Sequence, residues 1–290
     1  MKICTSCRNR FDGSDWRCPR CAFAPAVIDG YVALAPELAR ASASGFANDD
    51  YRALAALEER HFWFRGRNKM IAAAMAKYCG DAQSFCEIGC GTGFVLHGVG
   101  ERFPRLALSG SEIAVAGLGH AQKRNPRATL FQMDATDIPF DEEFDVVGAF
   151  DVLEHIANDE HAIAGIFRAL RRGGHAVITV PQHMFLWSEQ DARAGHARRY
   201  GIDELGDKLA AAGFRIEMRS SFVTILLPVL ALTRRFGKPS DGAELRAEFR
   251  LPRALDALFE ATLDVERMLF SMGARVPFGG SQLMVAQKPA

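Results

Sequence analysis

The sequence has no net charge, no long hydrophobic run and no leader pattern at its first residues. Its 35 basic and 35 acidic residues cancel to a formal charge of zero, so no overall field draws the chain to nucleic acid or acidic lipid. The longest strongly apolar run, Phe222–Leu232, contains Pro228 and is shorter than the ~18 to 20 residues that cross a bilayer. Met1–Cys4 lacks the charged and then apolar pattern of a signal peptide. We therefore expect a cytosolic protein with reduced thiols and no transmembrane segment.

Cysteine is scarce, and four of the seven cysteines form two C-x-x-C pairs near the N-terminus. Two such pairs can surround a tetrahedral zinc ion, and so short a stretch has no core, so the metal would supply its folding energy. A disulfide pair or a redox motif is the alternative. With four thiolates and Zn²⁺ the ribbon is nearly neutral, which argues against strong phosphate contact. The predicted zinc ligands are Cys4, Cys7, Cys18 and Cys21.

A short apolar strand that runs into a glycine-rich turn is predicted near the middle of the first half of the chain. The strand is Phe85–Ile88, and glycine then occupies every second position from Gly89 to Gly93. Glycine lets a ligand lie against the backbone and permits a positive φ. A dinucleotide fingerprint would need glycine where Phe94 stands, so the spacing argues against a dinucleotide.

Three later predicted strands also end in an acid, each after an intervening helical stretch. The carboxyl ends of parallel strands meet at one edge of a sheet, which is where ligands bind in such folds. A carboxylate at the end of the second strand can accept both hydroxyls of a ribose. The alternative is that each acid is an exposed turn residue. These acids are Glu112, Asp134 and Asp151.

The pattern E-x-G-x-G-x-G, together with the acids that follow it, resembles motif I and its neighbours in the class I S-adenosylmethionine-dependent methyltransferases. The resemblance implies an α/β fold with a Rossmann-like seven-stranded methyltransferase sheet. The cysteine pairs add an N-terminal zinc ribbon to this fold, and apolar helical stretches near the C-terminus add a helical insertion before the last strand. The resemblance also implies that Glu87, the acid of this pattern, supports the amino end of the methionine moiety, that Glu112 holds the ribose and that Asp134 bonds the adenine amino group. The implied cofactor-binding residues are Glu87, Gly89, Gly91, Gly93, Glu112, Ile113, Asp134, Ala135 and Asp151.

The segment before this core is predicted to contain a linker, Ala33–Asp50, and two helices, Tyr51–Arg60 and Asn68–Tyr78. Between the helices, His61–Arg67 reads H-F-W-F-R-G-R, which resembles the N-terminal cover that folds over the cofactor in small-molecule members of the family. The resemblance implies that Arg67 pairs with the methionine carboxylate. A plain helix-packing cluster is the alternative.

A stretch rich in titratable and aromatic groups follows the fifth predicted strand at the ligand-bearing edge. Over Trp187–Tyr200 it reads W-S-x-x-D…G-H-x-R-R-Y, which resembles the same methyltransferases. Methyl transfer to a hydroxyl needs a base, and we predict His196 in that role because imidazole titrates near neutral pH. His155 is the second candidate base, and Tyr200 or Arg199 would orient the acceptor. A loop whose arginines pair with nearby acids is the alternative.

Two further features concern a metal and the acceptor. Asp151, Glu154 and His155 resemble a metal-binding set of the ubiquinone O-methyltransferases, but this D-V-L-E-H form is common in members that need no metal, and we expect no catalytic metal. Between the sixth and seventh predicted strands, Phe222–Leu232 and Arg253–Met272 read as apolar helices and suggest a lid over a bulky or apolar acceptor. Contact with a membrane surface is the alternative to burial.

We therefore predict an S-adenosylmethionine-dependent methyltransferase that acts, at oxygen, on a small-molecule or carrier-bound biosynthetic intermediate and holds structural Zn²⁺. One alternative is an RNA base methyltransferase, because the ribbon resembles in part that of zinc-bearing ribosomal RNA guanine methyltransferases. Another is a docking protein without activity, against which the intact turn and acids argue. The predicted domains are the ribbon at 1–30, the linker and cover at 31–80, the core at 81–221, the lid at 222–275 and the closing strand at 276–290.

Overall fold

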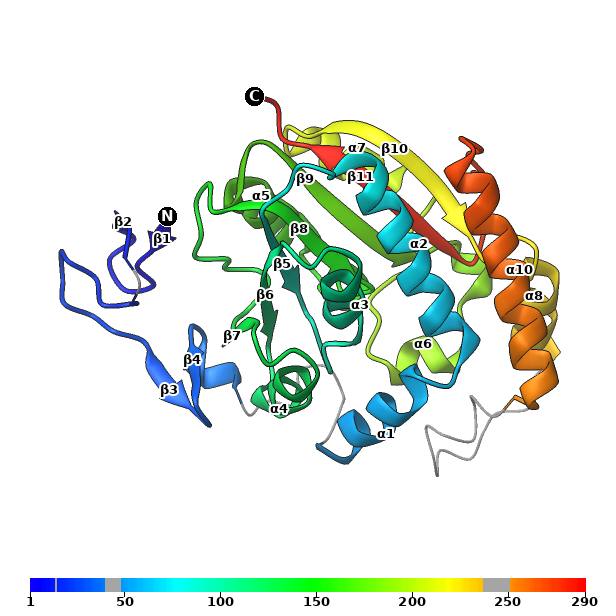
Figure 1. Cartoon of the computed structure of the whole chain (residues 1–290), viewed down its shortest axis with the longest axis horizontal. Coiled ribbons are helices and arrows are strands. Elements are labelled where there is room, and N and C mark those ends of the chain that lie inside the picture. Colours follow the sequence, from blue (N-terminus) through cyan, green and yellow to red (C-terminus); the bar gives the residue numbers. More distant parts are fainter. Residues whose placement is uncertain (14, 40–47, 237–250) are drawn as a thin grey trace.

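The structure is a computed structural model that describes residues 1–13, 15–39, 48–236 and 251–290, and a mixed sheet of nine strands forms its centre (Figure 1). The strands of this sheet are β3 (Ala26–Ile28), β4 (Tyr31–Ala33), β5 (Ser84–Ile88), β6 (Ala107–Glu112), β7 (Thr129–Gln132), β8 (Phe144–Phe150), β9 (Leu170–Pro181), β10 (Arg215–Phe222) and β11 (Ser281–Gln287). They lie in the order β10-β11-β9-β8-β5-β6-β7-β4-β3. The six strands from β9 to β4 in this order run parallel, and β3, β10 and β11 are antiparallel to their neighbours.

The strands predicted for the core, β5 to β11, all form, and the last two pair with each other despite the long insertion between them. Two more strands, β3 and β4, arise where the ribbon was expected to end and the linker to begin. Val32 of β4 pairs with Phe131 of β7, so the incoming chain covers what would otherwise be an open sheet edge. The rest of the expected linker includes residues 40–47, which lie outside the described residues.

Helices cover both faces of the sheet. They include α1 (Asn48–Glu58), α2 (Phe62–Tyr78), α3 (Phe94–Arg102), α4 (Val115–Arg124), α5 (Asp159–Ala169), α6 (Glu189–Arg193) and α7 (Glu204–Ala211). Because strand side chains alternate, Phe85 and Val146 pack with α2, α3 and α4, whereas Cys86 and Val147 pack with α5 and α7 (Figure 1). Cys86 and Cys90 are buried free thiols of this region.

Helix α2 begins at Phe62, so the aromatic segment expected between two helices forms its first turns. His61 precedes the helix and accepts the Trp63 N–H at its Nδ1, at 3.3 Å. Helix α10 (Arg253–Ser271) packs along α2, where Gly66 leaves room for the Leu263 side chain (Figure 1).

Helix α8 (Leu227–Phe236) comes before α10 in the chain, and the intervening residues 237–250 lie outside the described residues. The lid role expected of these two helices stays a prediction. Within the described ranges, no helix combines the length and the apolar character needed to traverse a bilayer.

The N-terminal ribbon, with strands β1 (Lys2–Ile3) and β2 (Arg10–Phe11), docks on the loop that follows β7. The Arg8 guanidinium donates two hydrogen bonds of 2.8 Å to the Asp137 carboxylate. This loop also contains Asp134, one of the predicted cofactor residues. The ribbon therefore packs on the connection between β7 and β8.

Candidate active site

The glycine turn between β5 and α3 contains one position with open space beside it. Gly89, Gly91 and Gly93 all have a positive φ, of 68°, 52° and 75°. A Cβ on Gly89 would lie 2.6 Å from Val152, and one on Gly93 would lie 2.8 Å from the Ala121 backbone, so these two glycines permit close packing. A Cβ on Gly91 would meet no described atom within 4 Å. A flat ligand can therefore lie against the backbone at Gly91.

Glu112, at the end of β6, holds the turn in place. Its Oε2 accepts the Gly91 N–H at 2.9 Å, and its Oε1 accepts the Ile113 N–H at 2.9 Å. Tyr51 of α1 also bonds to this carboxylate, which is buried. Burial raises the pKa of Glu112, and the backbone hydrogen bonds oppose that rise. Glu112 thus lies beside the open space, where the expected ribose contact would need it.

Asp134 and Ala135 lie in the loop after β7. Thr136 donates its N–H and its hydroxyl, each at 2.8 Å, to the Asp134 carboxylate. Gln132, the last residue of β7, donates to the Ile113 carbonyl at 3.0 Å and ties the ends of β6 and β7 together. A local turn therefore fixes Asp134, and its contact with an adenine stays a prediction.

Helix α1 is fastened to the glycine turn by buried polar side chains. Glu58 of α1 accepts hydrogen bonds from the hydroxyl of Thr92, in the turn, and from Arg124 of α4. Arg124 also donates to the Thr92 hydroxyl at 2.6 Å. Burial raises the pKa of Glu58, and the Thr92 hydrogen bond and the Arg124 charge lower it in part. Helix α1 therefore forms one wall of the site.

Arg67 of α2 lies at the other side of the turn. Its guanidinium pairs with the Asp151 carboxylate and lies over the Trp63 ring, 4.5 Å from the centroid. Asp151 has a φ of 56°, a conformation uncommon outside glycine and concentrated at functional sites. Burial raises the pKa of Glu87 well above its usual value, and the Arg67 charge opposes the rise.

Two buried polar atoms of these residues have no hydrogen-bond partner in the described part of the chain, Arg67 Nε and Glu87 Oε2. An amino-acid ligand carries a carboxylate for the first and an ammonium group for the second. The residues present therefore fit the methionine part of the expected cofactor.

Asp191, to which the sequence analysis gave no role, organises the loop after β9. Its Oδ1 accepts from Arg199 Nε at 2.9 Å and Nη2 at 2.6 Å, and its Oδ2 accepts the Ser188 N–H at 2.8 Å. His196 Nδ1 lies 3.2 Å from Asp191 Oδ1. Burial alone would raise the pKa of Asp191, but the contact with His196, the hydrogen bonds from Arg199 and the charge of Arg234 hold this pKa below its usual value. Arg199 thus anchors Asp191, in place of the expected contact with an acceptor.

Glu154, His155 and His196 converge beside this loop, with potential ligand atoms within 4.8 Å of one another. The two imidazole rings lie 4.7 Å apart and nearly perpendicular. Glu154 is fully buried, and neither carboxylate oxygen has a hydrogen-bond partner among the described residues, although Oε1 lies 4.0 Å from His196 Nε2. Burial and then the Asp151 charge raise the pKa of Glu154 well above the usual value. Burial and then the charge of His196 lower the pKa of His155 to about 4. The cluster can accept a proton or hold a divalent cation.

Tyr200, expected to orient the acceptor, lies in the core instead. Its side chain is fully buried, and its hydroxyl donates to Asp159 Oδ2 at 2.5 Å. Lys208 also donates to that carboxylate oxygen, at 2.7 Å. The physical reason is that neighbouring side chains in extended backbone point in opposite directions, so Arg199 reaches Asp191 and Tyr200 faces the interior.

Aromatic side chains lie on the outer side of the same loop. The His183 ring lies 5.1 Å from that of Phe185 and 4.1 Å from that of Phe278. Phe185 is 62% exposed. His183 and Val223 have φ values of 68° and 60°, in the left-handed region that such residues rarely adopt. This exposed aromatic surface suits an apolar acceptor.

The four cysteines of the ribbon converge as expected of zinc ligands. Their sulfurs lie within 4.8 Å of one another, and Cys4–Cys21 and Cys7–Cys18 are each 3.7 Å apart. Four Zn–S bonds of about 2.3 Å in a tetrahedron place the sulfurs about 3.8 Å apart. The cluster is therefore compatible with zinc, and its cysteines form no disulfide.

The parallel strands at the centre of the sheet, with helices on both faces and a glycine turn after β5, define a Rossmann-like fold. Residues 56–218, more than half of the chain, match the family described as a methyltransferase domain, and the chain belongs to this family. A probable S-adenosylmethionine-dependent methyltransferase of Mycolicibacterium smegmatis is 28% identical over 169 residues, which cover 57% of this chain and 64% of that protein. The chain thus spans slightly less than two thirds of that relative.

Solved structures show the same fold at low sequence identity. Phosphoethanolamine N-methyltransferase 2 of Haemonchus contortus, solved with S-adenosylmethionine, superposes with a TM-score of 0.56 at 19% identity over 88% of this chain and 60% of that one. The cyclase SpnF superposes with a TM-score of 0.51 at 18% identity over 79% of this chain and 83% of that one. Because one of these proteins is a cyclase, the acceptor and the chemistry must be argued from the site itself.

Proposed function

We propose that the chain binds S-adenosylmethionine beside Gly91 and transfers the methyl group to oxygen of a small-molecule or carrier-bound acceptor. The observation that carries this proposal is the open position in the glycine turn, with Glu112 bonded to it and the unpartnered atoms of Arg67 and Glu87 nearby. When bound, the cofactor supplies a methyl group already activated on a sulfonium sulfur. The chain has to align the acceptor and remove its proton.

His196 is the residue best suited to take that proton. Asp191 lies at its Nδ1, at 3.2 Å, and would stabilise the imidazolium formed when Nε2 accepts a proton. His155 has a pKa of about 4, so it is a weak base at neutral pH. The exposed ring of Phe185 favours an apolar acceptor on this side of the site.

The ribbon supports a small-molecule acceptor over RNA. Its Arg8 and Arg10 pair with Asp137 and Asp141 of the core, so two of its cations are already bound within the protein. Accumulated positive charge is what phosphate contact requires.

The test combines binding and turnover. Calorimetry should show binding of S-adenosylmethionine, and methyl from labelled cofactor should enter a small-molecule extract and not bulk RNA. His196→Ala should lower turnover ~100-fold or more with unchanged cofactor affinity, whereas His161→Ala, on the exposed side of α5, should leave both unchanged. Full turnover by His196→Ala would exclude the base role, and absence of cofactor binding would exclude the enzyme.

A divalent cation is the second candidate for activating the acceptor, because Glu154, His155 and His196 bring ligand atoms within 4.8 Å. In that case turnover would depend on added Mg²⁺ or Mn²⁺, and Glu154→Gln would weaken that dependence. Turnover independent of either cation supports His196 as the base.

A further inference from the structure

The outward side of α10 is apolar along its length. Leu258 is 56% exposed and Met268 53%, and Met272, which directly follows the helix, is 77% exposed; we call these three side chains the outward stripe. The acids of this helix are instead engaged within the protein. Asp256 and Glu260 pair with Arg65, Asp264 pairs with Lys69, and Glu266 accepts the Ile225 N–H. The outward stripe therefore carries no unpaired acid of its own helix.

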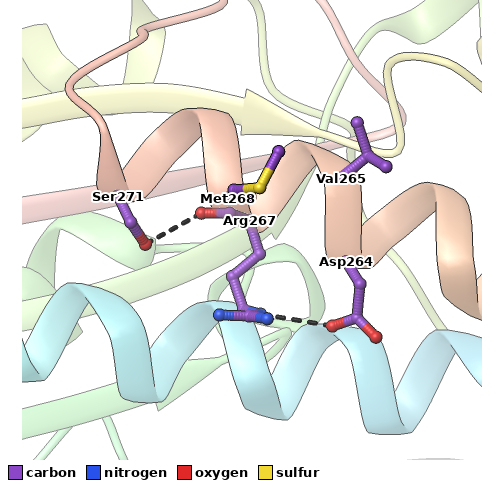
Figure 2. Close-up of a pocket in the computed structure, with 5 residues that line it drawn as sticks. All are labelled: Asp264, Val265, Arg267, Met268 and Ser271. Carbon is purple, nitrogen blue, oxygen red and sulfur yellow. Dashed lines mark hydrogen bonds and ion pairs between the residues drawn. The ribbon is translucent and has the colours of Figure 1, made fainter.

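A basic groove of about 760 Å³ runs beside this stripe, between α2 and α10. None of the ion pairs within the described ranges involves Lys77 or Arg102, and both side chains are exposed. Figure 2 shows Val265 and Met268 on one side of α10 and the Arg267–Asp264 pair directed toward α2. The groove is lined by Lys69, Ala72, Ala73, Ala76, Lys77, Arg102, Asp264, Arg267 and Ser271.

We propose that this α10 surface, the stripe together with the groove, docks on an anionic lipid bilayer. Apolar side chains of an interfacial helix enter the boundary between headgroups and acyl chains, and neighbouring cations bind acidic headgroups. Four basic side chains line the groove against one carboxylate, Asp264, which pairs with Lys69 and Arg267. The other two cations, Lys77 and Arg102, are therefore the ones left to bind acidic headgroups. A second copy of the chain fits less well, because pairing two stripes about a twofold axis would bring two basic grooves near each other.

Vesicle co-sedimentation of the full chain tests the proposal. Vesicles of phosphatidylcholine with phosphatidylglycerol should bind the protein at least tenfold more tightly than phosphatidylcholine alone, and the difference should shrink as salt is raised. Two double variants should each weaken binding about tenfold or more: Lys77→Glu with Arg102→Glu in the groove, and Leu258→Asp with Met268→Asp in the stripe. Lys123→Glu with Arg127→Glu removes the same charge at exposed positions at the end of α4 and just beyond it, and should leave binding unchanged.

Circular dichroism and the urea unfolding midpoint verify that each variant is folded, and Leu258→Ser is the substitute if the aspartate variant is not. Equal binding to neutral and acidic vesicles, or no binding to either, overturns the proposal. The proposal is also overturned if light scattering shows a dimer that dissociates on Leu258→Asp and the protein does not bind vesicles.

Discussion

A glycine in the turn can permit a positive φ, and it can leave space for a ligand. Replacing Gly91 by alanine separates these two roles. The new Cβ would meet no described atom within 4 Å, so the cost to folding comes from the φ of 52°, about 1 to 2 kcal/mol for a left-handed residue. Gly173 offers a matched control, because its φ is 78° and its Cβ would also meet no described atom within 4 Å. Both variants should therefore lose a similar amount of unfolding free energy.

The two variants should differ in cofactor binding. If S-adenosylmethionine lies beside Gly91, the added methyl group overfills the site and weakens the binding free energy by about 1 to 3 kcal/mol. This loss corresponds to a roughly 5- to 150-fold higher Kd. Urea unfolding gives the stability of each variant, and calorimetry gives the affinity. Wild-type affinity in Gly91→Ala, at the stability loss seen for Gly173→Ala, would refute the placement of the cofactor.

Three further predictions concern pH, zinc and the loop after β9. Folding lowers the pKa of the His155 imidazole from 6.5 to about 4, so as the pH falls the unfolded chain is protonated at His155 before the folded chain. The contribution of neutral His155 to the free energy of unfolding is therefore complete above pH 6.5 and is lost as the pH falls toward 4. Urea unfolding at several pH values should show this loss, and His155→Gln should flatten it. Cys4→Ser with Cys21→Ser should abolish zinc binding in metal analysis and speed hydrogen exchange near Asp137, where the ribbon docks; retained zinc would contradict the ligand assignment. Asp191→Asn should lower kcat at least about tenfold with unchanged cofactor affinity, and an unaltered kcat would show that Asp191 does not position His196.

The core of the fold could be predicted because its signals are local. Apolar runs that end in an acid or a glycine turn mark β5 to β8 and place their ends at one edge. Strands β3 and β4 could not be found this way, because each has three residues and shows no periodicity. Their position depends on pairing of β4 with the edge of β7, a strand far away in the sequence, and a local pattern cannot predict that pairing.

In the candidate site, too, the residues with local sequence signals could be predicted and those placed by long-range packing could not. Glu112 lies beside Gly91 because both follow directly from strand ends. The roles expected of Arg199 and Tyr200 depended on where their side chains point, and their partners Asp191 and Asp159 are set by packing. Asp191 had a signal of its own, because Ser188 and Asp191 form a capping box with the spacing S-x-x-D, although that pattern marks a helix start and reveals no chemistry.

The pairing of β4 with β7 has a practical consequence for trimming the protein. A shortened chain that started at residue 56, where the family match begins, would lose Val32 and its neighbours, and the amides and carbonyls of β7 that face β4 would have no strand to pair with. Unprotected strands of this kind recruit other chains. Recombinant production of the catalytic portion alone should therefore yield aggregates, and a usable fragment must retain the hairpin that seals the sheet.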